Sequence, residues 1–142
     1  MALSVKNLER CVETLKLSLE KLQECDPDSI EYEIYRNAVI KGFELTIETS
    51  GTLLKKALKP YFSTPAAVDQ LFFKDIFRKA AHFDIIELES VERWFRYRDD
   101  RNLTAHDYGE NLADDTISHL SHFVNDVYAL IKALKNKVDA DD

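Results

Sequence analysis

A short polar stretch in the last third of the sequence holds the side chains best suited to chemistry. Residues 101–108 read Arg-Asn-Leu-Thr-Ala-His-Asp-Tyr, and Gly109, one of three glycines in the protein, follows directly. Arg101 cannot lose its charge and can fork onto a phosphate, whereas His106 can move a proton near neutral pH. The two side chains together are therefore suited to a reaction on a phosphodiester.

RNA fits this pair better than DNA, because its own 2'-hydroxyl is the nucleophile and no metal-bound water is required. Arg101 would stabilise charge that builds on phosphorus, and His106 would exchange a proton with the attacking or leaving oxygen. The expected products are a cyclic phosphate end and a 5'-hydroxyl end. The competing interpretation is an exposed turn after a helix, where Arg101 complements the helix dipole and His106 is a surface residue.

The elements that must position this stretch are predicted to be helices. The 142 residues include three Gly and three Pro, too few for the turns of a many-stranded sheet. The hydrophobic share of 45% and the charged share of 32% are typical of a soluble globular protein. We expect one domain, residues 1–142, with an all-α fold: an up-and-down bundle of about five helices.

The first two helices should form an antiparallel hairpin. Apolar residues at spacings of three and four predict a helix over residues 3–24, which Asp26-Pro27 ends. The second helix begins at Asp28 or Ser29 and continues to residue 59, before Pro60. Gly51 marks a close crossing or a bend within it. The expected inner faces are Leu8, Val12, Leu15, Leu19 and Leu22 in the first helix, and Ile40, Phe43, Ile47, Leu54 and Leu58 in the second.

The remaining helices follow at Thr64-Pro65, near residue 85 or 90, and after Gly109. Threonine followed by proline predicts the start of a third helix, which we expect to continue through Ala80. The last helix repeats apolar residues at spacings of four and three, and residues 139–142 should fray. Its seam comprises Ala113, Ile117, Leu120, Val124, Val127, Ile131, Leu134 and Val138.

The fourth predicted helix continues to about residue 100 and carries most of the nearby cations. Its apolar arc is Val91, Trp94 and Phe95, and the opposite arc collects Arg93, Arg96, Tyr97, Asp100 and Arg101. The net charge of −7 argues against a broad electrostatic contact with nucleic acid. RNA must therefore meet a local positive patch or bind with the help of a partner.

Two other polar groups have weaker functional interpretations. One face of the last helix carries Asp115, His119, His122 and Asp126, which we interpret as a solvated arc, and we predict no metal site. Glu44 and Glu48 lie one turn apart and are either a carboxylate pair or flanking charges. No cofactor is expected. No apolar run reaches the length of a membrane span and no signal-peptide core is present, so we expect a cytoplasmic protein that does not contact membranes.

The motif Arg101-x4-His106, with Asn102 after the arginine, resembles the Arg-x(4–6)-His motif of HEPN domains. With Tyr108 it resembles the HEPN toxins paired with a minimal nucleotidyltransferase antitoxin, formerly described as nucleotidyltransferase substrate-binding proteins. The block Arg-Asn-Ala-Val-Ile-Lys-Gly-Phe-Glu-Leu-Thr-Ile-Glu, residues 36–48, is similar to a second signature of that subfamily. Trp94, Glu110 and Ala113 match the block around the motif. Thr104-Ala105 and Asp107 depart from it, because small hydroxyl residues are expected around the histidine.

The resemblance implies a helical bundle that forms a two-fold dimer, with Arg101 and His106 of both chains in a shared cleft. Arg93, Arg96 and Arg98 of both copies would make that cleft positive and bind RNA. It further implies a metal-independent endoribonuclease acting on RNA, with tRNA as the substrate, in which Asn102 positions the site. The implied partner is a cognate minimal nucleotidyltransferase that restrains the toxin by AMPylating Tyr108.

Two interpretations without catalysis remain. The chain can be a binding module that presents itself or a substrate to a nucleotidyltransferase. It can also be a helical dimer without a site, which predicts that Tyr108 is buried or unmodified and that the arginine face is fully paired with Glu and Asp.

Overall fold

The computed structural model describes the backbone of residues 4–106 and 110–141, and the side chains of residues 4–102 and 117–136. The described elements are α1 (Lys6–Glu24), α2 (Ile30–Leu58), a 3-10 turn η1 (Lys59–Tyr61), α3 (Pro65–Asp69), α4 (Phe73–His82), α5 (Leu88–His106) and α6 (Glu110–Asp141). This part of the chain contains no strand, so the predicted all-α class is confirmed.

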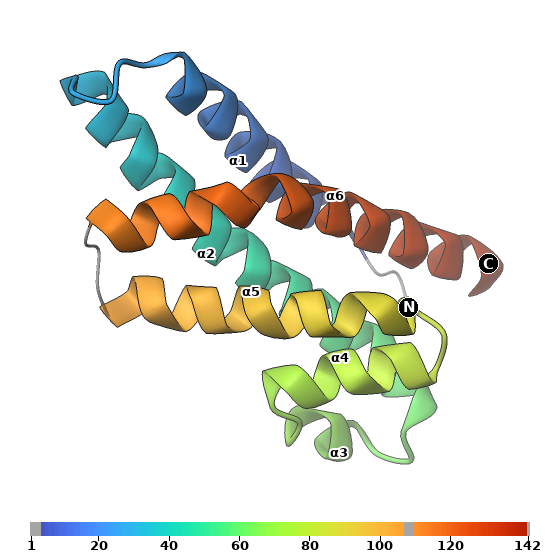
Figure 1. Cartoon of the computed structure of the whole chain (residues 1–142). Coiled ribbons are helices and arrows are strands. Elements are labelled where there is room, and N and C mark those ends of the chain that lie inside the picture. Colours follow the sequence, from blue (N-terminus) through green and yellow to red (C-terminus); the bar gives the residue numbers. More distant parts are fainter. Residues whose placement is uncertain (1–3, 107–109, 142) are drawn as a thin grey trace.

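The first two helices form the predicted hairpin (Figure 1). Ser29 caps α2, because its hydroxyl accepts a hydrogen bond from the N–H of Tyr32 at 3.1 Å. Every residue of the two predicted inner faces is buried. The apolar spacing of both helices therefore identified the sides that pack.

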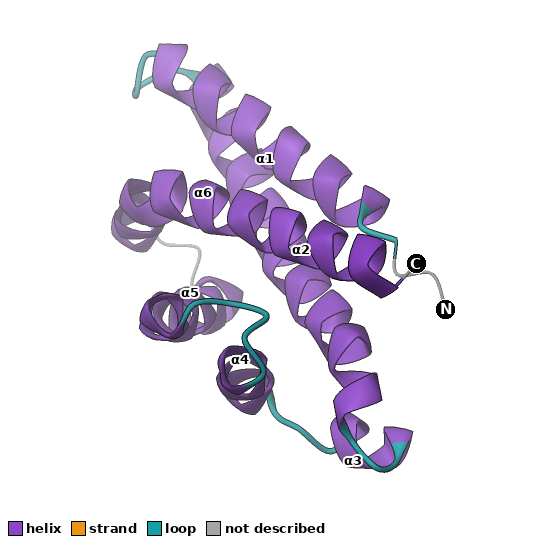
Figure 2. Ribbon diagram, turned by 90° about the vertical axis from the view of Figure 1, so that its right-hand side faces the viewer, coloured by secondary structure: helices purple, strands orange, loops and turns teal. Residues whose placement is uncertain are grey.

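Helix α2 is the central element, and it packs against α1, α4, α5 and α6 (Figures 1 and 2). Gly51 makes a close crossing possible, as the sequence suggested. A Cβ at Gly51 would lie 3.0 Å from the ring of Phe73 on α4. The absence of a side chain thus lets α4 approach the backbone of α2.

The predicted third helix is wrong as a single element, because the chain leaves helical geometry between α3 and α4. In one continuous helix, Val68 would point about a third of a turn away from the buried face of Ile76, Phe77 and Ala80. The break at Phe72, which has extended backbone geometry, allows both sets to be buried. The packing of both faces outweighs continuation of the helix.

The fourth and last helices are longer than predicted. Helix α5 continues to His106, and α6 is helical as far as Asp141. The expected fraying of residues 139–142 stays a prediction. No Gly or Pro follows Gly109 to stop α6. The described seam residues of α6 are buried, apart from Ile117, which is partly buried.

No helix in the described part of the chain combines the length and apolar character that a membrane crossing requires.

Candidate active site

The candidate chemical stretch lies at the C-terminal end of α5, directly before α6 in the sequence. The side chains of Arg101 and Asn102 are described, and Asn102 is exposed. His106 ends α5, but its side chain lies outside the described residues, and Tyr108 lies outside them entirely. The roles of His106 and Tyr108 thus stay predictions.

Arg101 lies on the inner side of α5, one turn beyond Tyr97 and two turns beyond Trp94. Its Nη2 donates a hydrogen bond to Oε1 of Glu48 on α2 at 2.8 Å. The Arg101 side chain is 20% exposed, whereas that of Glu48 is 51% exposed. The guanidinium is therefore held at the crossing of α5 and α2 by a carboxylate on its solvent side.

The sequence placed Tyr97 on the arc opposite Trp94, and this placement is wrong. Tyr97 is 2% exposed and packs edge-on against both Trp94 and Phe123. Helix α5 contacts α2, α4 and α6, so its buried side is wider than one apolar arc. A phenol and an arginine complete that side because each can reach a polar partner on a neighbouring helix.

An aromatic cluster fixes the part of α5 that precedes the motif in the sequence. Trp94 is 1% exposed and stacks on Phe77 of α4, with ring centroids 4.6 Å apart. Phe123 of α6 contacts Trp94, Tyr97 and Phe43 of α2 edge-on. Rings from four helices therefore lock the segment that leads to Arg101.

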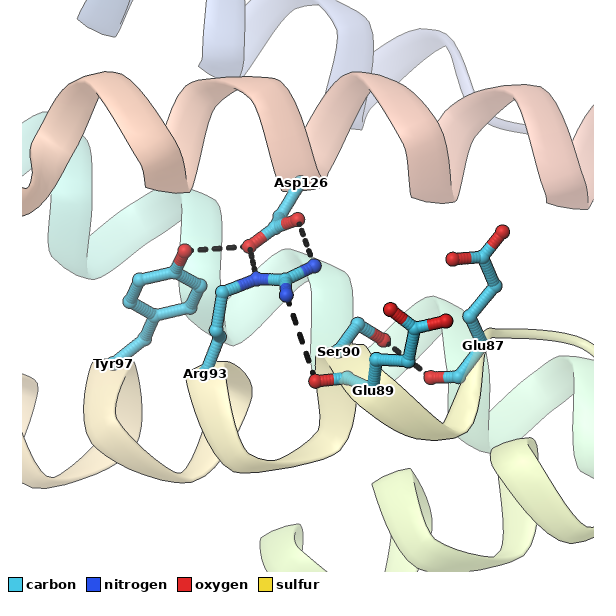
Figure 3. Close-up of polar contacts among 6 residues, drawn as sticks. All are labelled: Glu87, Glu89, Ser90, Arg93, Tyr97 and Asp126. Carbon is cyan, nitrogen blue, oxygen red and sulfur yellow. Dashed lines mark hydrogen bonds and ion pairs between the residues drawn. The ribbon is translucent and has the colours of Figure 1, made fainter.

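Asp126 of α6 connects two residues of α5 in the network shown in Figure 3. It accepts bonds from Nε and Nη2 of Arg93 at 2.9 and 3.0 Å, and from the hydroxyl of Tyr97 at 2.5 Å. Burial of the phenol, followed by its bond to Asp126, raises the pKa of Tyr97. The hydrogen bonds that Arg93 donates to Asp126 raise the pKa of Arg93.

The predicted RNA-binding arginines do not share one face of the protomer. Arg93 is turned toward α6, and Arg98 lies over the ring of Phe73 on α4, 5.0 Å from its centre. Arg96 is exposed, and its charge lowers the pKa of the nearby Asp100 carboxyl group. Arg93 and Arg101, which the helical spacing placed on one arc, therefore have partners on α6 and α2, and this corrects the predicted single arginine face. RNA binding by Arg93, Arg96 and Arg98 stays a prediction.

The polar arc of α6 faces α5 rather than solvent over part of its length, which corrects the solvated interpretation. Besides Asp126, His119 lies beside α5, with Nδ1 3.5 Å from Oδ2 of Asp100 in a geometry that completes no hydrogen bond. Burial raises the pKa of Asp100 against the opposing effect of His119. His122 is exposed, and the side chain of Asp115 lies outside the described residues. Among the described side chains, no three His, Cys, Asp or Glu gather as metal ligands would.

Residues 3–136 match the sequence model of a protein family described as "Nucleotidyltransferase substrate binding protein like". The chain belongs to this family. This confirms the membership predicted from the motif at residues 101–108 and the block at residues 36–48. The chain is also 29% identical over 98 residues to a Haemophilus influenzae protein named "Probable ribonuclease HepT". The aligned part is 69% of this chain and 66% of the relative, slightly less than two thirds of its length.

In this member of the substrate-binding-protein-like family, the α2 block contributes Glu48, which bonds to Arg101, and a second carboxylate, Glu44. Glu44 is 8% exposed and lies one turn before Glu48. With Asn37, Ile40 and Lys41, it lines a cavity of about 360 Å³. The sequence suggested that Glu44 and Glu48 are either a carboxylate pair or flanking charges. Neither interpretation connected these glutamates with Arg101. The feature of the sequence that could have indicated a polar site on α2 was the pair of carboxylates, one turn apart, beside its apolar stripe.

A larger groove of about 830 Å³ lies at the opposite end of α5, between the α4–α5 connection and α6. Arg101 is not part of its described lining, so the groove is separate from the candidate site of this family member. Its walls include Ile85, Leu88, Ser90, Arg93, Ala129 and Ala133.

Proposed function

We propose that the protein is an endoribonuclease in which Arg101 and His106 act on the same phosphodiester. The observation that carries the proposal is the placement of Arg101, which the α5–α2 crossing holds at the end of α5, five residues before His106 in the sequence. The similarity to a protein named as a probable ribonuclease supports the same chemistry. Family membership supports a nucleotidyltransferase as the partner.

In the proposed reaction, the RNA 2'-hydroxyl loses its proton and attacks the adjacent phosphorus. The bond from phosphorus to the 5'-oxygen breaks, and that oxygen gains a proton. The products are a cyclic phosphate end and a 5'-hydroxyl end. Arg101 stabilises the negative charge on the phosphoryl oxygens, His106 transfers one of the two protons, and Asn102 positions the site.

A second copy of the chain completes the proposed site. The formal charge of −7 makes one protomer a poor surface for RNA, and three of its α5 cations point toward different helices. A two-fold dimer with the ends of α5 near its axis would double the local positive charge. We propose tRNA as the substrate and AMPylation of Tyr108 by the cognate nucleotidyltransferase as the control, because AMP phosphates beside the cleft would repel RNA.

The test is cleavage of a tRNA pool in EDTA by the wild-type protein, Arg101→Ala and His106→Ala. We expect each variant to lose activity by about a hundredfold or more, because each removes a group that acts in the transition state. Prior incubation with the cognate transferase and ATP should silence the wild type and add AMP to Tyr108. Equal cleavage by all three proteins would exclude the motif from the mechanism.

The alternative is a non-catalytic module that binds the nucleotidyltransferase. The ion pairs of Arg93 and Arg101 agree with a different interpretation, the helical dimer without a site, which predicts that these arginines are paired with Glu and Asp. The cleavage experiment, together with expression of the chain without its partner, separates the module from the proposal. A module binds the transferase but yields no cleaved RNA and no growth arrest when it is expressed without its partner.

A further inference from the structure

The contact between Arg101 and Glu48 differs from the other arginine pair of α5. Asp126 binds Arg93 through Nε and Nη2 together, which occupies one edge of the guanidinium. The bond to Glu48 comes from the terminal nitrogen Nη2 of Arg101. Arg93 thus forms a bidentate pair with its carboxylate, whereas the bond from Arg101 to Glu48 uses one terminal nitrogen.

Glu48 comes from a part of α2 that is held on several sides. Gly51, three residues later, lies against Phe73 of α4, and Phe43 packs on Phe123 of α6 at 4.9 Å between ring centroids. Threonine and serine hydroxyls along this segment bond to the carbonyls one turn earlier, including Thr52 to Glu48. The carboxylate therefore extends from a backbone with little freedom to move.

An arginine side chain that is four-fifths covered needs a counter-charge if it is to keep one orientation. Loss of the bond to Glu48 would widen the range of rotamers open to the long Arg101 side chain, and ordering them would add to the barrier of any step that uses the guanidinium. Catalysis by charge stabilisation depends on groups that are oriented before the substrate arrives.

We propose that Glu48 is a positioning residue of the active centre, which fixes the guanidinium of Arg101 so that its fork faces the substrate phosphate in one orientation. This inference rests on the proposed ribonuclease function. Glu48 takes no part in proton transfer and acts through Arg101. The opposite role, a carboxylate that blocks Arg101 until RNA displaces it, makes different predictions for the same variants.

The experiment compares kcat and KM for RNA cleavage by Glu48→Ala, Glu48→Gln and Glu48→Ala/Arg101→Ala. We expect Glu48→Ala to lower kcat by about tenfold or more with little change in KM. Glu48→Gln should restore most of kcat, because its amide oxygen still accepts the bond from Nη2. The double variant should be no slower than Arg101→Ala alone.

The matched control is Glu9→Ala. Glu9 of α1 bonds to Lys135 of α6 at 3.2 Å and is 41% exposed, so it makes a comparable ion pair between helices away from the motif. It should leave kcat unchanged. Wild-type kinetics in Glu48→Ala, or a higher kcat/KM in either Glu48 variant, would overturn the positioning role.

Failure of the proposed function would be recognised separately, as equal cleavage by the wild type and Arg101→Ala. The order of the Arg101 guanidinium, measured by side-chain ¹⁵N relaxation, then tests the contact without turnover. Order that falls in Glu48→Ala and not in Glu9→Ala would support positioning. Unchanged order in Glu48→Ala would overturn it.

Discussion

Charged residues of α5 have different partners although they lie within a few turns of one another. Arg93 and Tyr97 share Asp126, Arg101 reaches Glu48, and Asp100 lies beside His119. What separates them is the neighbouring helix that each one faces. The position of each guanidinium of α5 therefore depends on whether a neighbouring helix supplies a carboxylate that binds it.

Asp100 provides a test by pH. Because burial raises its folded-state pKa, the folded chain binds this proton more tightly than the unfolded chain does. The resulting stabilisation is present below the usual Asp pKa of about 3.9 and is lost as pH rises through the folded-state value. Asp100→Asn should therefore raise Tm near pH 7, with a gain that shrinks toward about pH 4.

The measurement is a series of thermal melts across this pH range, with Asp69→Asn as the control, because that carboxylate lies on α3 and is 59% exposed. A difference in Tm between Asp100→Asn and the wild type that stays constant with pH would contradict the burial of a charged carboxyl.

Among the elements, α2 contains two glycines with opposite surroundings. A Cβ at Gly51 would lie 3.0 and 3.2 Å from ring atoms of Phe73, whereas one at Gly42 would lie 3.4 Å or more from Leu15. Gly42→Ala should raise the free energy of unfolding by up to about 1 kcal/mol, because alanine favours the helix. Gly51→Ala should lower it by about 1 kcal/mol or more, because the ring of Phe73 must shift out of its packed position.

Urea unfolding of the two variants measures both effects under the same conditions. Equal stabilisation by the two alanines would mean that the crossing of α2 and α4 is looser than the position of Phe73 indicates.

The helices could be predicted largely from the sequence, because apolar spacing and caps are local signals. Ser29 and Thr64 cap the helices that they were expected to cap. The break before Phe73 could not be predicted in this way, since it depends on how Val68 and Ile76 are buried together. The contact of Arg101 with Glu48 also lay beyond local patterns, because it joins residues 53 positions apart.

For the whole molecule, the central question is how an acidic chain would bind RNA. Its net charge is −7, and the cations of α5 are divided among neighbours. In a dimer with a two-fold axis, Arg101 of one subunit can face Arg101 of the other, which brings together cations that a single subunit keeps apart.

Mixing two inactive variants tests a shared cleft. Arg101→Ala and His106→Ala should each be inactive alone, while a refolded mixture should regain activity because mixed dimers keep one guanidinium and one imidazole in the same cleft. Sedimentation would confirm the dimer, and a mixture of His106→Ala with wild type controls for exchange. A mixture as inactive as its components would indicate that each site is confined to one subunit.

The pairing of Lys135 with Glu9 ties the late part of α6 to the start of α1. Both ends of the described chain consequently lie on one side, whereas α5 ends and α6 begins on the other (Figure 1). A fluorescent reporter or affinity tag fused at either terminus would extend away from the motif, which makes the chain convenient for immobilisation in assays with RNA or a protein partner.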